Sequence, residues 1–168
     1  GDWSSDVCSS DLVLWDWAPH DLAMCLALFG ERPARVAAEF ESQRDTAEGR
    51  AEIVRIELAF PGGGSAGIRV GNDLPKTRRF AVRCKDAEIV CDDLAGEKLT
   101  VRPLPPGGGA ATATPVAVNA TLPLAAAVRD FASMIRNDDR RQDGLVLAAT
   151  VVELLAQCDD CLRVRTRG

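Results

Sequence analysis

Apolar residues recur with a helical period near the start of the chain. Over residues 16–29 they fall at i, i+3, i+4 and i+7, which is the spacing of one face of an α-helix. Gly30 and Pro33 follow, a pattern typical of a helix C-terminus. The sequence therefore predicts a helix over residues 16–29, with a buried stripe made of Leu22, Cys25, Leu26 and Phe29.

The period changes to two between residues 35 and 102. Apolar and polar residues alternate through residues 54–60 and 79–84, as they do in half-buried β-strands. Shorter strands are predicted at residues 36–40, 66–70, 88–91 and 98–101. Turns rich in Gly, Asn and Asp separate these strands, and such short links favour an antiparallel meander.

The last third of the chain returns to a helical pattern after a loop. Residues 103–115 contain mostly Pro, Gly, Ala and Thr, which predicts a flexible loop. Residues 124–136 carry an apolar stripe made of Leu124, Val128, Phe131 and Ile135. Residues 144–162 are apolar on nearly every side as far as Val152, which predicts burial between other elements. Strands bracketed by helices predict one α+β domain, a mostly antiparallel open β-sheet with helices packed on one face.

Composition excludes several classes of function. The 168 residues include 20 Lys+Arg and 25 Asp+Glu, a formal net charge of −5, and they show no basic cluster. A chain with that balance lacks the electrostatic surface of a nucleic-acid-binding protein. No apolar run approaches the length that a membrane-spanning helix needs. We therefore expect neither nucleic acid nor a membrane as a partner.

The first twelve residues, GDWSSDVCSSDL, follow neither pattern. They have no basic start and no apolar run, so they are not a signal peptide. They resemble the translation, in one reading frame, of a common short-read sequencing adapter. We expect residues 1–12 to be a non-native, adapter-derived segment and residues 13–168 to be a native domain, a C-terminal fragment of a longer gene product.

Cysteine usage indicates a reducing compartment. Apart from Cys8, the cysteines are Cys25, Cys84, Cys91, Cys158 and Cys161. An odd number without a secretion signal differs from the dense, even pattern of secreted disulfide scaffolds, so we expect a cytoplasmic protein. The rival interpretation is a zinc site of four thiolates, from Cys84, Cys91, Cys158 and Cys161. Only one C-x-x-C pair is present and it lies near the end of a predicted helix, so we expect no metal.

His20 is the chain's only histidine and the leading candidate for chemistry. At 100° per residue it lies about 170° from the centre of the apolar stripe of its helix, with Asp16 and the small Ala23 and Ala27 nearby. A carboxylate four residues earlier can orient an imidazole and raise its basicity. Alternatively, Pro19 lies in the first helical turn and Asp16 is the N-cap. The competing structural interpretation is a histidine hydrogen-bonded at a packed helix start.

Residues 62–67 match the G-x-G-x-x-G pattern formally and follow a predicted strand. A dinucleotide site needs a helix to begin there, so that the helix N-terminus receives the pyrophosphate. Residues 66–70 instead alternate as another strand. The sequence predicts a hairpin turn, and no cofactor-binding residues in this chain.

Several motifs in order give the chain a family resemblance. They are Asp16-x-x-x-His20, the helix end Gly30-x-x-Pro33, Phe60-Pro61-Gly62-Gly63, Asp92-Asp93, Pro123-Leu124 leading to Val128-Arg129-Asp130-Phe131, and the closing segment from Asp143-Gly144-Leu145 to Cys158. Together they resemble the C-terminal domain of the Gfo/Idh/MocA oxidoreductases. Members of that family are NAD(P)-dependent dehydrogenases of sugars, cyclitols and related polyols.

The resemblance implies roles for two residues. His20 would be the general acid/base on the substrate hydroxyl, and Asp16 would orient and polarise it. The family often has another acidic residue three positions after the histidine, where this chain has Ala23. The family's nucleotide-binding Rossmann domain, and the lysine of its E-K-P motif, are missing from this chain. The fragment alone is therefore expected to be inactive, and NAD or NADP would be bound mainly by the missing domain.

The resemblance also implies a homo-oligomer through the open sheet face. The outward row there would include Arg55, Glu57, Arg79 and Arg83. The alternative function is a stand-alone, non-catalytic scaffold or dimerisation module of the same fold.

Overall fold

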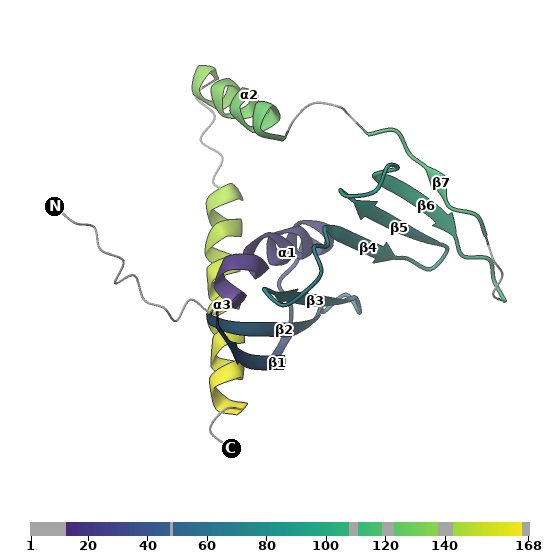
Figure 1. Cartoon of the computed structure of the whole chain (residues 1–168). Helices are drawn as coiled ribbons and strands as arrows, with labels where there is room; N and C mark the ends of the chain where they lie inside the picture. Colours follow the sequence, from purple (N-terminus) through teal and green to yellow (C-terminus); the bar gives the residue numbers. More distant parts are fainter. Residues whose placement is uncertain (1–12, 48, 108–110, 119–122, 138–142, 166–168) are drawn as a thin grey trace. The chain divides into compact units, whose positions relative to one another are not determined.

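The computed structural model describes residues 13–47, 49–107, 111–118, 123–137 and 143–165 (Figure 1). The adapter-like segment 1–12 lies outside the described residues. The helices are α1 (Val13–Phe29), α2 (Pro123–Arg136) and α3 (Asp143–Arg165). The strands are β1 (Arg35–Thr46), β2 (Gly49–Ala59), β3 (Ser65–Gly71), β4 (Arg79–Arg83), β5 (Ala87–Asp92), β6 (Leu99–Pro103) and β7 (Thr114–Pro115).

The α+β class and the antiparallel pairing are confirmed, but the strands form two sheets instead of one meander. One sheet has the order β1-β2-β3 and the other β4-β5-β6-β7, and every pairing in both is antiparallel. The chain also separates into two compact units where the sequence predicts one domain. The first unit is Gly1–Leu74 with Arg141–Gly168, and the second is Pro75–Arg140.

The first unit contains the core. α1 and α3 pack against each other and against the β1-β2-β3 sheet, with α3 on β1 and α1 mainly on β3. On β2, Val54, Ile56 and Leu58 point toward the helices and are at most 1% exposed, while Arg55 and Glu57 between them are exposed. The helices therefore cover one face of this sheet, as predicted, and leave the other open.

β1 contains a β-bulge that alternation alone did not predict. Phe40 pairs with Val54 and Ser42 with Ile53, which leaves Glu41 as an extra residue. Beyond the bulge, the amide of Gln43 donates a hydrogen bond to the buried carboxylate of Glu52 at 3.0 Å. The bulge therefore sets which side chains of β1 face inward.

The glycine-rich segment after β2 is a hairpin turn, as predicted. The amide of Phe60 donates to the carbonyl of Gly64 at 2.9 Å, and Gly63 has a φ of 87°. β3 follows at once, so no helix begins here to receive a pyrophosphate. This loop does not form a dinucleotide site.

The second unit has regular secondary structure without burial. None of its described residues is buried, although β4 and β5 alternate as clearly as β2 does. α2 forms as predicted, but its apolar stripe lies open: Leu124, Val128, Phe131 and Ile135 are each more than half exposed. The loop predicted over residues 103–115 contributes the two-residue strand β7, which pairs with β6.

The prediction that the first half of α3 is buried was wrong. Leu145, Val146 and Val152 are between 54% and 73% exposed. Burial begins at Thr150 and continues on one stripe, which includes Leu154, Leu155, Cys158 and Leu162. The reason is that the start of α3 extends past α1 and the sheet (Figure 1), so the first unit does not cover its apolar residues there. Among the described residues, no helix is both long and apolar enough to cross a membrane.

Candidate functional site

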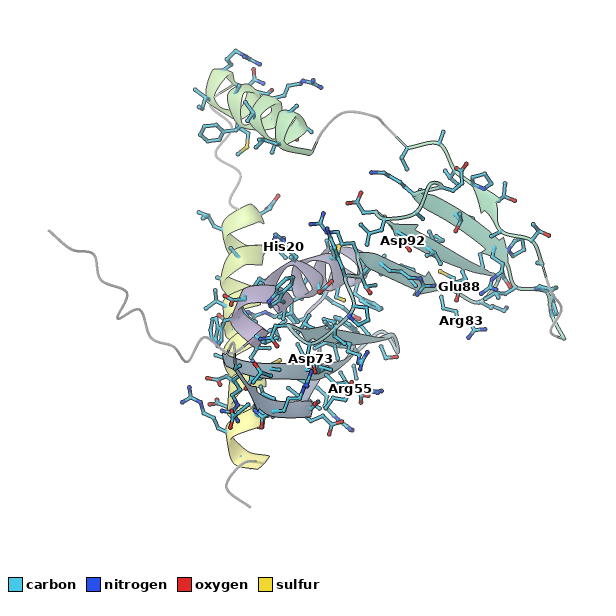
Figure 2. All side chains as sticks on the ribbon, viewed as in Figure 1. His20, Arg55, Asp73, Arg83, Glu88 and Asp92 are labelled. Atoms are coloured by element: carbon cyan, nitrogen blue, oxygen red, sulfur yellow. The ribbon has the colours of Figure 1, made fainter. Side chains whose placement is uncertain are left out.

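α1 presents its two predicted site residues to solvent. Leu22, Cys25 and Leu26 on its inner face are no more than 7% exposed, while Asp16 and His20 are both exposed. In Figure 2 the His20 side chain stands on α1. The predicted orientation of His20, away from the core stripe, is confirmed.

The suggestion that Asp16 is an N-cap was wrong. α1 already begins at Val13, so Pro19 lies inside the helix and not in its first turn. Asp16 and His20 are consequently both helical and four residues apart, which brings their side chains to neighbouring positions on one face. Pro19 has no N–H, so the helix forgoes one internal hydrogen bond directly before His20.

The side chains of Asp16 and His20 do not interact with each other in the structure. Both belong to the described part of the chain, and no hydrogen bond or ion pair joins them. Catalytic hydrogen bonds often form only when a ligand is bound, so this geometry is compatible with a pair that meets around a substrate. Both groups remain open to an incoming molecule.

Sequence reasoning missed Asp21, next to His20. Its carboxyl is partly buried, and this burial raises its pKa above the usual aspartate value, while the nearby His20 acts in the opposite direction. A carboxyl that resists ionisation beside a candidate acid/base is a common feature of functional sites. The available signal was its position on the helical wheel, between the polar face and the apolar stripe.

The cysteines do not assemble a metal site in the part of the chain that the structure describes. No three His, Cys, Asp or Glu residues there are grouped to hold an ion, and the five described cysteines are free thiols. Burial raises the pKa of Cys25 to about 11, with a smaller effect from Asp21. Burial likewise raises the pKa of Cys158 to about 12, with a contribution from Cys161. These two thiols stay neutral at ordinary pH.

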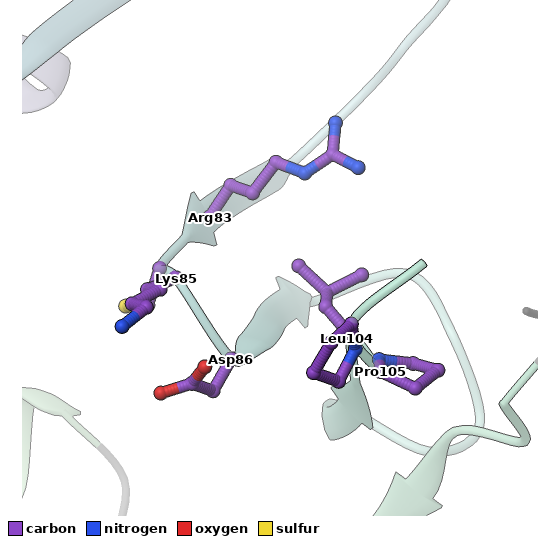
Figure 3. Close-up of a pocket in the computed structure, with 7 residues that line it drawn as sticks. Arg83, Lys85, Asp86, Leu104 and Pro105 are labelled. Atoms are coloured by element: carbon purple, nitrogen blue, oxygen red, sulfur yellow. The ribbon is translucent and has the colours of Figure 1, made fainter. Parts of the chain in front are cut away.

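The second unit contains a hollow at the β4–β5 turn, of about 460 Å³. Figure 3 shows how Arg83, Lys85 and Asp86 border it together with Leu104 and Pro105. Its charges are mixed and none of its lining residues is buried. None of the predicted site residues lines it.

The outward row of charges predicted from the sequence is divided between the two sheets. Arg55 and Glu57 lie on β2 and bind each other at 2.9 Å, whereas Arg79 and Arg83 lie on β4. On the same open face of the first sheet, the guanidinium of Arg69 on β3 binds the bulge residue Glu41 on β1. This face is charged and largely paired.

Comparison with known proteins identifies a family whose model matches this chain. Residues 1–90 match the model of the GFO/IDH/MocA C-terminal domain. No curated protein sequence gives a significant match.

Similar solved structures agree with that match. One is a protein assigned to the oxidoreductases from Magnetospirillum magnetotacticum MS-1, with 34% identity, a TM-score of 0.77, and coverage of 88% of this chain and 48% of that one. A UDP-N-acetylglucosamine 3-dehydrogenase from Acidithiobacillus ferrooxidans has 21% identity, a TM-score of 0.72, and coverage of 90% and 49%. A dehydrogenase from Chromobacterium violaceum has 17% identity, a TM-score of 0.68, and coverage of 98% and 49%. This chain thus spans about half the length of the structures it resembles.

Proposed function

The chain belongs to the Gfo/Idh/MocA family of oxidoreductases, and from that membership we propose that residues 13–168 are the catalytic and oligomerisation domain of a cytoplasmic, NAD(P)-dependent dehydrogenase. Its substrate is a sugar, a cyclitol or a related polyol, oxidised at a secondary alcohol or formed by reduction of a ketone. One similar structure is a dehydrogenase of a nucleotide sugar, which supports this substrate class.

The observation that carries the proposal is the exposure of Asp16 and His20 on a helix whose opposite face is anchored in the core. Leu22, directly beneath this face, is fully buried, so the site is held on a rigid element. His20 accepts the proton of the substrate hydroxyl during oxidation and returns it during reduction. Asp16, one turn earlier, orients the imidazole and stabilises its charged form.

The described residues of this chain do not fit a dinucleotide. The glycine-rich candidate among the described residues is the hairpin at residues 62–67, where no helix N-terminus is available for a pyrophosphate. We therefore assign the cofactor, which supplies and accepts hydride, to a second half of the parent enzyme. The length of the similar structures, about twice the matched region, supports this assignment. The chain alone is expected to give no turnover.

The open face of the first sheet is the proposed surface for a homo-oligomer. Its paired charges, including Arg55–Glu57 and Arg69–Glu41, can be exchanged between copies of the chain without leaving an unpaired charge.

The deciding experiment is to sequence the source locus upstream of the Val13 codon and express the complete enzyme. We expect a strand–GxGxxG–helix unit and an E-K-P motif upstream, and NAD(P)-dependent turnover of a cyclic polyol or sugar. In that enzyme, His20→Asn is expected to lower kcat/KM by about 10²–10⁴-fold, and Asp16→Asn by less. Asp160→Asn, an exposed carboxylate on α3, is the matched control and should change little.

Two results would contradict the proposal. A start signal directly before Val13 would leave a stand-alone scaffold module without catalysis. Turnover by the purified 168-residue chain would show that the chemistry does not depend on a second half.

A further inference from the structure

Both tryptophans within the described residues stand beside Asp16. Trp15 is 38% exposed and Trp17 is 56% exposed, although the chain has no tyrosine and few aromatic residues of any kind. A tryptophan side chain contributes more apolar surface than any other residue type, so leaving one in water forgoes a large favourable burial. An exposed indole next to a candidate acid/base therefore needs an explanation.

Helix geometry separates the two indoles. Trp17 precedes His20 by three residues, which places it about 60° around the helix and one turn away, within reach of the same ligand. Trp15 precedes His20 by five residues and lies about 140° around, toward the buried side. Trp17 and Asp16 thus flank His20 on two adjacent rows of one exposed face.

The face beyond His20 leaves room for a ring. Ala23 and Ala27 follow on the rows next to His20, and neither side chain extends past its Cβ. Met24, one turn after His20, and Leu28, two turns after it, are 41% and 49% exposed, and both carry flexible aliphatic side chains. Among the described residues of α1, Trp17 is the one that offers a flat aromatic surface within one turn of the imidazole.

Resting on the proposed function, we propose that Trp17 is a substrate-contact residue: its indole carries the apolar C–H face of the sugar or cyclitol ring whose reacting hydroxyl lies at His20. A pyranose or cyclitol ring has hydroxyls at its rim and C–H bonds on its faces. Indole matches this with an apolar ring face and an N–H donor at its edge. Stacking on Trp17 sets the plane of the ring and hence which hydroxyl reaches His20, so Trp17 determines specificity for cyclic over acyclic polyols.

The test uses the full 168-residue chain and three probes: myo-inositol and N-acetyl-D-glucosamine as rings, and glycerol as an acyclic polyol. NMR follows the imidazole signal, which belongs to His20 because the chain has one histidine, and the indole N–H signals, assigned from single Trp→Phe variants. A ring is expected to shift the His20 and Trp17 signals together and to leave Trp15 almost unchanged. Glycerol at equal concentration is expected to shift neither.

Variants then separate stacking from general surface effects. Trp17→Ala is expected to weaken ring binding about tenfold, the size of an aromatic contact of this kind, and Trp17→Phe by about threefold or less. Leu28→Ala removes a comparably exposed apolar side chain farther along the same side of the helix, and it should change the Kd less than twofold.

The possible results distinguish the proposal for Trp17 from the proposed function. If rings shift His20 while Trp17 stays silent, or if Trp17→Ala binds as the unsubstituted chain does, the proposal for Trp17 is wrong and the proposed function stands. If neither residue responds to any ring, this face of α1 does not bind the substrate class, and both proposals fail. Equal shifts of the Trp17 signal with rings and with glycerol would show that Trp17 does not determine specificity for cyclic over acyclic polyols.

Discussion

The two units of the chain use the same alternation of residues and differ in what they bury. In the first unit, β2 places Val54, Ile56 and Leu58 under two helices, almost fully out of water. In the second, β4 alternates in the same way, yet Phe80 and Val82 are only partly covered. The lesson is that alternation determines how a strand forms, whereas stability depends on a second layer that covers it.

The helices repeat this contrast. Leu22 on α1 is fully buried, whereas Phe131 on α2 is 65% exposed, and both belong to apolar stripes with helical spacing. A helix as short as α2 is marginal in water without tertiary packing. The second unit therefore depends on contacts that it does not make among its own described residues.

The largest expected difference between the units comes from one substitution made in both. Leu22→Ala removes a fully buried side chain from the first unit and is expected to cost about 2–5 kcal/mol of unfolding free energy. Leu124→Ala makes the same change on α2, where the side chain is 76% exposed, and is expected to cost about 0.5 kcal/mol or less. Urea denaturation measures both costs, followed by the NMR amide signals of β2 for Leu22→Ala and by those of β5, in the second unit, for Leu124→Ala. A cost above about 1 kcal/mol for Leu124→Ala would mean that α2 is covered in solution.

A smaller effect is expected from alkaline pH, and it is confined to the first unit. The pKa of Cys25 is raised to about 11 and that of Cys158 to about 12, from an ordinary value of 9.0. The folded state then holds two protons that the unfolded chain loses above pH 9. Stability is therefore full below pH 9 and falls as pH rises toward the folded pKa values, by about 1 kcal/mol per pH unit for each thiol.

Urea denaturation at pH 8, 9 and 10 measures this slope, and no tyrosine titrates in that range. Cys158→Ala is expected to be less stable throughout but to show about half the slope. An unchanged slope would contradict burial of Cys158. Ellman's reagent provides a second comparison, since Cys84 and Cys91 are exposed and should react without unfolding.

The smallest expected effect is the same in both units, so here the contrast between them disappears. A hydrogen bond from Arg44 and its charge lower the pKa of Asp73 in the first unit, and Lys98 does the same for Asp93 in the second. Any stabilisation is present above the ordinary aspartate pKa and is lost as pH falls through the lowered value. Because Arg44, Lys98 and Asp93 are exposed and Asp73 is partly exposed, Arg44→Gln and Lys98→Gln should return each pKa toward 3.8 without a measurable change in unfolding free energy. Carbon NMR titration of the carboxyl groups tests this, and a Lys98→Gln variant with a clearly lowered stability would show that the pair is shielded from water.

Most of the elements could be predicted from the sequence, because periodicity reports which residues face a neighbouring layer. It could not predict that the strands divide into two sheets, since no local pattern distinguishes a short link within a sheet from one between sheets, as at residues 72–78. The same limit explains α3: its apolar residues before Thr150 predicted a covering layer that the first unit does not provide.

The candidate site was predictable in part for a similar reason. The wheel placed His20 opposite the core stripe, and the structure agrees. Pro19 misled the placement of Asp16, because proline is most common in a first turn and is here inside the helix. Asp21 escaped notice because partial burial depends on neighbours from outside the helix.

The bulge in β1 has a consequence for how this chain tolerates insertions and deletions. Losing the codon for Glu41 would preserve the reading frame and remove only an exposed side chain and its ion pair with Arg69. Because Glu41 is the residue without a partner on β2, Ser42 would then follow Phe40 directly, and Gln43 would keep its place opposite the buried Glu52. Substitution and deletion at residue 41 are therefore both expected to cost little, whereas deletion of Gln43 would take away the amide donor of the buried Glu52. In an alignment of descendants of this gene, position 41 is expected to vary in identity and to accept a gap of one residue.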